Sequence, residues 1–337
     1  MPKIFLHIGA NKTGTTAIQH FLHVNAGTLR HRGILYPETG RGDPGAGEML
    51  HYNLAASLGY RAGGRGSNPA RKDAATLKSE LLDEMATAKC DRVVISSESF
   101  MLRRDASKVA EFFAGFDISV IVYLRRHDKW LESLLTQAIK TVPRPPRELG
   151  LEGYLAHQEK INGQYLDYLD LLRHWAAAFG KERIIVRPFE ARQNRPNIVA
   201  DFLDAIGADS AHSGLISGDT IFNASLPGKA LMLIDMVNRS RLPERFRRYL
   251  VRQTIAEFKD TKSVSILSPE LRRSLAQRYC KDYEIIAREY LGRPDGRLFF
   301  DALCDRDDAY EPLTAPGIMD VARFAFRMLA RAPRMKR

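Results

Sequence analysis

The sequence predicts an α/β protein in which helices flank a doubly wound parallel sheet and a helical C-terminal part follows. Short apolar runs recur along the chain, and most are continuous rather than alternating, as expected of strands buried on both faces. Segments with helical periodicity separate these runs, so the crossovers between strands should be right-handed. No long linker or low-complexity run interrupts the 337 residues. One large core is therefore preferred, with two independent domains as the alternative.

The expected strands are residues 3–8, 33–36, 92–97 and 119–124, with 183–187 as a fifth. The expected helices between them are residues 15–24, 74–88, 107–113 and 128–140. In such folds the loops at the carboxyl ends of the strands hold the ligand. After Pro188 the strand pattern gives way to helical patterns. We therefore expect an α/β domain over residues 1–300 and a C-terminal extension over 301–337.

Two segments stand apart from this alternation. Residues 40–71 are rich in Gly, Arg and Pro and contain His51 and Tyr52, which fits either a mobile lid over the site or a disordered insertion. Residues 321–337 interleave arginines with apolar residues. This pattern indicates an amphipathic helix, which either covers a core or lies on a membrane surface.

The chain is basic, with a formal net charge of +11 and a pI near 9.6. This charge suits a phosphorylated nucleotide, an acidic polysaccharide, a membrane surface or nucleic acid. Nucleic acid is disfavoured, because zinc-finger spacing, RNA-recognition aromatics and a basic region leading into heptads are missing. The cysteines, Cys90, Cys280 and Cys304, have no C-x-x-C spacing, which predicts free thiols and no metal site. Since no apolar run is long enough to span a membrane, we expect a cytoplasmic protein, located at the inner membrane surface if residues 321–337 bind lipid.

The most informative segment is a loop between the first expected strand and helix. It reads Gly9-Ala10-Asn11-Lys12-Thr13-Gly14-Thr15-Thr16. Glycines permit a tight turn, successive N–H groups point inward, and the helix N-terminus adds partial positive charge. The loop is therefore predicted to bind phosphate or a similar anion.

The same loop differs from that of an ATPase. Gly9 and Gly14 have the separation of a Walker A motif, but Thr15 stands where the Walker lysine belongs, and the lysine lies inside the loop at Lys12. From there it can reach the bridging oxygen between a 5′-phosphate and the group leaving it, where negative charge develops. A catalytic role for Lys12 without a metal ion follows. A nucleotide or small-molecule kinase remains an alternative.

At this point the sequence resembles a known family. Lys12-Thr13-Gly14-Thr15-Thr16 is similar to the loop K-[ST]-G-T-[ST] of sulfotransferases that use 3′-phosphoadenosine 5′-phosphosulfate (PAPS), and His7-Ile8-Gly9 is typical of a bacterial branch. The resemblance implies a P-loop type sheet, PAPS as co-substrate and no metal. It also implies that the 5′-phosphosulfate is bound by Asn11, Lys12, Thr13, Gly14, Thr15 and Thr16.

A second motif follows the fourth expected strand. The family places an arginine at the strand end and a serine eight residues later to bind the 3′-phosphate, and Arg125 and Ser133 keep this spacing. Many relatives have Asn-Pro or Asp-Pro after the arginine, whereas Arg126-His127 follows here, so Arg126 is the alternative ligand. Arginine suits phosphate because its donors form a rigid fork. Weaker likeness runs through residues 175–190.

Direct sulfuryl transfer, the reaction of this family, needs a base near the acceptor hydroxyl. Glu98 follows the third expected strand and is a candidate, although it could equally be a capping or ion-paired carboxylate. His51, in the possible lid, and Glu38, after the second strand, are weaker candidates. His7 lies within an apolar strand and is expected to be structural.

The acceptor cannot be identified from residue patterns, and the hydroxyl of a carbohydrate or glycolipid is the leading hypothesis. A basic cluster could face an acidic glycan or could be an ordinary solvated surface; it comprises Arg239, Arg241, Arg245, Arg247, Arg248 and Arg252. A catalytically silent nucleotide-binding or glycan-binding module on the same fold is a further alternative.

Overall fold

The computed structural model describes residues 2–42, 49–60, 72–102, 105–141, 156, 160, 166–208, 226–258, 261, 264–302, 309–314 and 317–331. Most of the possible lid at 40–71 lies outside these residues. The chain forms two compact units. The first comprises Met1–Arg126, Asn162–Phe222 and Tyr279–Asp301, and the second comprises His127–Ile161, Asn223–Arg278 and Ala302–Arg337. The two units do not follow the predicted division at residue 300, and that domain boundary stays a prediction.

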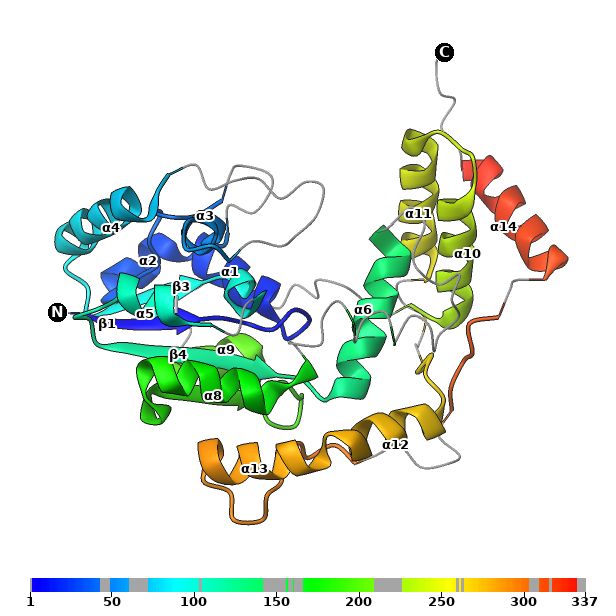
Figure 1. The fold of residues 1–337 in the computed structure, drawn as a ribbon. Coiled ribbons are helices and arrows are strands. Elements are labelled where there is room, and N and C mark those ends of the chain that lie inside the picture. Colours follow the sequence, from blue (N-terminus) through cyan, green and yellow to red (C-terminus); the bar gives the residue numbers. More distant parts are fainter. Residues whose placement is uncertain are drawn as a thin grey trace. The chain divides into compact units, whose positions relative to one another are not determined.

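The first unit is built on a parallel sheet. Its strands are β1 (Lys3–His7), β2 (Ile34–Leu35), β3 (Arg92–Ser96), β4 (Ile118–Leu124) and β5 (Ile184–Pro188). Their order in the sheet is β2-β3-β1-β4-β5, and all neighbouring pairs are parallel. Figure 1 labels the central strands β3, β1 and β4. The chain therefore winds from β1 toward one edge and later toward the other. The predicted doubly wound sheet is confirmed, and each expected strand boundary is within one residue of the observed one.

Helices cover both faces of this sheet (Figure 1). In the first unit they are α1 (Thr15–Val24), α2 (Ala26–His31), α3 (Tyr52–Ser57), α4 (Ala74–Ala88), α5 (Ser107–Phe112), α8 (Tyr168–Phe179), α9 (Ile198–Ala205) and α13 (Cys280–Leu291), with short 3₁₀ helices η1 (Glu98–Leu102) and η3 (Lys181–Arg183). The predicted helices α1, α4 and α5 are confirmed. Local capping supports two boundaries: Asp73 accepts a hydrogen bond from the N–H of Thr76 at α4, and Asn197 accepts one from Ala200 at α9.

One hydrophobic cluster joins α1, α2 and α9 to the sheet. It includes Phe5 and Val94 from the strands, Phe21 and Leu22 from α1, and Phe202 from α9. Each of these large side chains contributes roughly 1.5–3 kcal/mol by its removal from water. Neighbouring strand residues such as Ile4 and Leu6 are also fully buried. Burial on both faces explains why the strands appear as continuous apolar runs rather than alternating ones.

The described part of the second unit is helical apart from turns and an isolated bridge. Its helices are α6 (His127–Thr141), α10 (Gly228–Arg239), α11 (Glu244–Phe258), α12 (Pro269–Arg278) and α14 (Ile318–Arg331). Helix α6, predicted over 128–140, is tied to this unit: Asp128 forms an ion pair with Arg272 at 3.5 Å, and Glu132 accepts hydrogen bonds from Ser265 Oγ and the N–H of Ile266. The predicted helical C-terminal part is confirmed. Within the described ranges, no helix combines the length and apolar character that crossing a membrane requires.

Candidate active site

The loop after β1 has the backbone of an anion-binding turn. Gly9 and Gly14 have φ of 64° and 80°, and Lys12, although not a glycine, has φ of 70°. A β-carbon on Gly9 would lie 2.8 Å from Thr15 Cγ2, so this glycine is required by space as well as by conformation. A left-handed lysine costs on the order of 1–3 kcal/mol and persists only where the surroundings enforce it. Strain of this kind concentrates at functional positions.

Thr13 holds the loop together. Its buried Oγ1 donates to the carbonyl of Ala10 at 2.6 Å and accepts from the N–H of Ala10 at 3.2 Å. Gly14 precedes α1 as its N-cap and supplies no side-chain acceptor, while its carbonyl receives the N–H groups of Ala17 and Ile18. The positive end of the α1 dipole therefore faces the loop. The polar side chains of Asn11 and Thr16 are exposed beside it.

Arg125 lies against this loop. Its guanidinium donates a hydrogen bond of 2.8 Å to the carbonyl of Lys12 and stands 5.4 Å from the ring centre of Phe189. The carbonyl of Arg125 in turn accepts a hydrogen bond of 2.8 Å from Tyr168. The ends of β1 and β4 thus bring two cations together, as expected for neighbouring strands of one parallel sheet.

Neighbouring charges affect the pKa of Lys12. Burial lowers the pKa of its ammonium group, the charge of Arg125 lowers that pKa further, and the charge of Glu98 raises it. Two cations and one carboxylate therefore lie within electrostatic reach of each other. Concentrated positive charge of this kind is suited to an anionic ligand, because a bound anion relieves the repulsion between Lys12 and Arg125.

Glu98 begins η1 at the carboxyl end of β3, and hydrogen bonds among buried polar side chains of α1, β1 and β3 orient its carboxylate. Gln19 Nε2 donates to Glu98 Oε2 at 2.9 Å and to Ser96 Oγ at 3.2 Å. Ser96 Oγ is also 2.8 Å from His7 Nδ1. Gln19 is almost completely buried, as are Ser96 and His7. The carboxylate of Glu98 is thus held in place by a buried amide.

The sequence did not predict a role for Gln19. This residue lies on α1, four residues after Thr15, and its polar side chain among apolar neighbours is the one sequence signal that could have indicated its role. In the structure it is buried. His7 has the structural place that was expected: its ring contacts those of Tyr123 and Phe202, and burial lowers its pKa to about 3.

His51 is buried and bound to main-chain groups. Its Nδ1 accepts from the N–H of Ser96 at 3.1 Å, so Nε2 carries the proton toward the carbonyl of Pro37 at 3.1 Å. Burial, with a smaller contribution from the charge of Arg41, lowers its pKa to about 3. Both ring nitrogens thus link the ends of β2 and β3. This arrangement is structural and does not favour His51 as a base.

Glu38 is exposed, and its backbone is fixed from α4. The N–H of Glu38 donates to Glu84 Oε1 at 2.8 Å, and the N–H of Thr39 donates to Glu84 Oε2 at 3.0 Å. Burial lowers the pKa of Arg41, and the charges of Tyr36, Glu38 and Glu84 partly offset this decrease. The Nε of Arg41 binds the carbonyl of Pro37 at 2.6 Å. The contacts described for Glu38 are therefore with α4 and with the segment that follows β2.

Of the two candidate arginines, Arg126 is the more deeply buried. It donates a hydrogen bond of 3.0 Å to the carbonyl of Asp301. Arg125 makes a similar main-chain contact but is only half-buried, so its guanidinium is the more accessible of the two. Ser133 is half-buried on α6 and belongs to the second unit, so the pairing of Arg125 with Ser133 stays a prediction.

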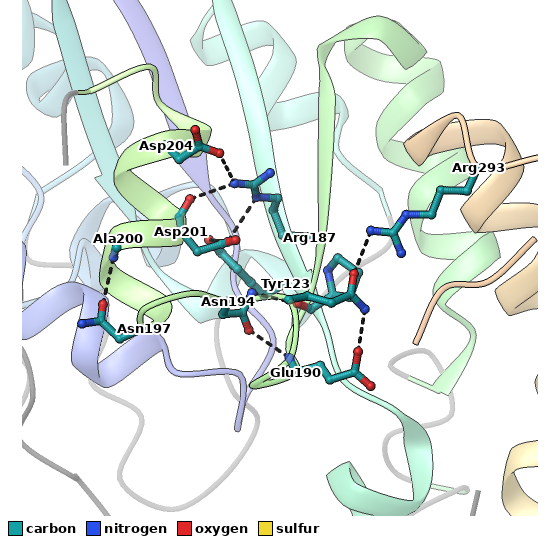
Figure 2. A network of polar contacts seen from close by, with 11 residues as sticks. Tyr123, Arg187, Glu190, Asn194, Asn197, Ala200, Asp201, Asp204 and Arg293 are labelled. Carbon is teal, nitrogen blue, oxygen red and sulfur yellow. Dashed lines mark hydrogen bonds and ion pairs between the residues drawn. The ribbon is translucent and has the colours of Figure 1, made fainter. Parts of the chain in front are cut away.

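A polar network fixes the chain that follows β5 (Figure 2). Arg187 pairs with Asp201 at 3.1 Å and with Asp204 at 2.5 Å, while Tyr123 donates to Asp201 at 2.6 Å. Beyond the strand, Glu190 accepts the N–H groups of Phe300 and Asp301. Two further hydrogen bonds join Gln193 to Glu190 and Arg293 to Gln193.

The network has a consequence for the loop. A β-carbon on Gly14 would lie 3.0 Å from both Ile198 Cγ1 and Phe189 Cε2, so the segment held by the network packs directly on the loop. The weak sequence resemblance of residues 175–190 did not predict these contacts. In the described part of the chain, no three His, Cys, Asp or Glu side chains gather to hold a metal ion.

The fold defines a parallel-sheet α/β protein with a tight, glycine-containing turn between β1 and the N-terminus of α1. The sequence matches no model of a known protein family. It is 29% identical over 208 residues to an uncharacterized protein of Archaeoglobus fulgidus, a match that covers 59% of this chain and 54% of that protein. The chain thus spans about half the length of this relative. A sulfotransferase from Alicyclobacillus acidocaldarius is similar in structure with a TM-score of 0.41 and 15% identity, over 76% of this chain and 93% of that one.

Proposed function

We propose that this protein is a sulfotransferase that moves the sulfuryl group of PAPS to an acceptor hydroxyl. The observation that carries the proposal is the left-handed Lys12 in a loop at a helix N-terminus, with Arg125 bound to its carbonyl and Glu98 within electrostatic reach. The loop residues 11–16 bind the 5′-phosphosulfate through N–H groups and hydroxyls. Arg125 binds the 3′-phosphate through its guanidinium group.

In the proposed reaction, the acceptor oxygen attacks sulfur as the bond between sulfur and the bridging oxygen breaks. The acceptor proton passes to Glu98, whose carboxylate is held by Gln19. The electron pair of the broken bond goes to the 5′-phosphate, where the ammonium group of Lys12 stabilises the developing charge. The product nucleotide is 3′-phosphoadenosine 5′-phosphate. No metal ion takes part in this scheme.

A carbohydrate or glycolipid is the proposed class of acceptor. Within the basic cluster, Arg239 pairs with Asp235, Arg248 with Glu244, and Arg247 donates to the carbonyl of Asn238. Arg241, Arg245 and Arg252 are exposed and form the part of the cluster that suits an acidic glycan.

The test is isothermal titration with 3′-phosphoadenosine 5′-phosphate in the absence of magnesium. We expect a Kd on the order of micromolar and a loss of about tenfold or more in Lys12→Ala and in Arg125→Ala, because each removes a charged hydrogen-bonding group. Lys108→Ala, an exposed lysine on α5, is the matched control and should bind like the wild type.

The outcomes separate the alternatives. Absence of binding, or a magnesium-dependent preference for ATP, would exclude the sulfotransferase and favour the kinase. Tight binding without consumption of PAPS across a panel of carbohydrate acceptors would favour a silent binding module.

A further inference from the structure

Helix α14 exposes large apolar side chains to an unusual degree. Ile318, Met319 and Phe326 are 88%, 65% and 76% exposed, the highest values among the large hydrophobic residues that the structure describes. With about 100° between successive residues of a helix, these three fall within roughly 100° of each other on the helix surface. They form one stripe, which we call the α14 stripe.

The opposite side of α14 is anchored to its own unit. Phe324 is buried in a cluster with Leu233 and Val237 of α10, and Arg327 pairs with Glu257 of α11 at 2.8 Å. Figure 1 shows α14 alongside α10. The helix therefore does not need the α14 stripe for packing, and the stripe faces solvent.

A cation borders the stripe. Arg323 is exposed on α14, about 40° from Met319 around the helix axis. Over residues 318–337 the sequence has six basic residues, Arg323, Arg327, Arg331, Arg334, Lys336 and Arg337, against the single acidic Asp320. This end of the sequence therefore carries an excess of positive charge.

We propose that α14 docks the protein on an anionic phospholipid bilayer. In this arrangement the α14 stripe enters the boundary between headgroups and acyl chains, and Arg323 contacts a lipid phosphate. An amphipathic helix of low net hydrophobicity, with apolar side chains on one face and arginines beside them, has the composition of a helix lying in the membrane surface.

The positive charge and the exposed apolar side chains of α14 together favour a bilayer as its binding partner. A second copy of the chain bound through the same stripe would bring two arginine-bordered faces together, and like charges in contact oppose such pairing. An acidic glycan would satisfy the arginines but leave Ile318, Met319 and Phe326 in water. A bilayer containing anionic lipid satisfies both features.

The test is co-sedimentation of the full chain with vesicles of phosphatidylcholine mixed with phosphatidylglycerol, compared with phosphatidylcholine alone. We expect binding to the mixed vesicles only. Phe326→Ser should weaken it about tenfold, since it removes a large apolar side chain from the interface. Arg323→Gln should weaken it about fivefold, as expected for one cation at an anionic surface.

Matched controls are Leu82→Ser on α4 and Arg173→Gln on α8, both exposed positions of the first unit. Both should bind like the wild type. Equal binding by Phe326→Ser and Leu82→Ser would overturn the proposal, because binding would then arise from net charge alone. Absence of vesicle binding, with concentration-dependent dimers that Phe326→Ser abolishes in sedimentation velocity, would identify a second copy as the occupant. The result does not depend on whether the protein binds PAPS.

Discussion

The side-chain amide of Gln19 donates a hydrogen bond of 2.9 Å to the carboxylate of Glu98, the proposed base. The amide comes from α1 and the carboxylate from the end of β3, so the two meet only because β1 and β3 are neighbours in the sheet. Gln19 contacts no substrate in the proposed reaction. It acts as a positioning residue for Glu98.

Substitution of this amide should separate turnover from binding. In Gln19→Met the side chain keeps its length but cannot donate, so we expect PAPS consumption to fall about tenfold or more, out of the 10²–10⁴ that general base catalysis contributes. Affinity for 3′-phosphoadenosine 5′-phosphate should change less than about threefold.

Turnover is measured as release of that nucleotide, and affinity by titration calorimetry. Gln277→Met on α12, an exposed glutamine, is the control. An equal loss of affinity and turnover in Gln19→Met would contradict a positioning role and indicate a general effect on folding.

A glycine series can test the backbone of the loop. Gly27→Ala on α2 has neither a positive φ nor an atom within 4 Å of the new methyl group, Gly207→Ala has φ of 66° but open space, and Gly9→Ala combines φ of 64° with a contact of 2.8 Å. We expect Gly27→Ala to raise the free energy of unfolding by about 0.5–1 kcal/mol. Gly207→Ala should lower it by about 1 kcal/mol, and Gly9→Ala should lower it by about 1–3 kcal/mol.

Urea denaturation of the three variants measures these differences. Only Gly9→Ala should also weaken binding of 3′-phosphoadenosine 5′-phosphate. If Gly207→Ala and Gly9→Ala lost the same stability and both bound normally, the loop would have no special requirement for Gly9.

The buried histidines should make the protein sensitive to acid. The pKa values of His7 and His51 are lowered from 6.5 to about 3 by burial. Below pH 6.5 the unfolded chain binds protons that the folded chain does not, so stability is complete above pH 6.5 and is lost as the pH falls toward 3. Each histidine should contribute on the order of 1 kcal/mol per pH unit in this window.

Urea denaturation at pH 7 and pH 5 measures this loss. His51→Gln, if it folds at pH 7, should lose less stability between these pH values than the wild type does. His31→Gln is the control, because His31 is exposed, and it should lose as much as the wild type. Identical pH dependence in all three proteins would show that His51 titrates normally.

Much of the first unit was predictable because local patterns determine it. Burial on both faces of a parallel sheet requires continuous apolar strands, and this requirement placed β1, β3 and β4 within one residue. The turn between β1 and α1 was predictable for the same reason, since its glycines and its lysine lie within six residues of each other between a strand and a helix.

The surroundings of the loop depended on contacts between distant residues. The sequence by itself determined the alternation of strands and helices, the loop with Lys12, and the strand-end position of Arg125. Only the tertiary structure brought Gln19 to Glu98, Arg125 to the carbonyl of Lys12, and both nitrogens of His51 onto main-chain groups. The physical reason is that periodicity depends on neighbouring residues, whereas the protonation and orientation of a side chain depend on what strand order and helix packing place around it.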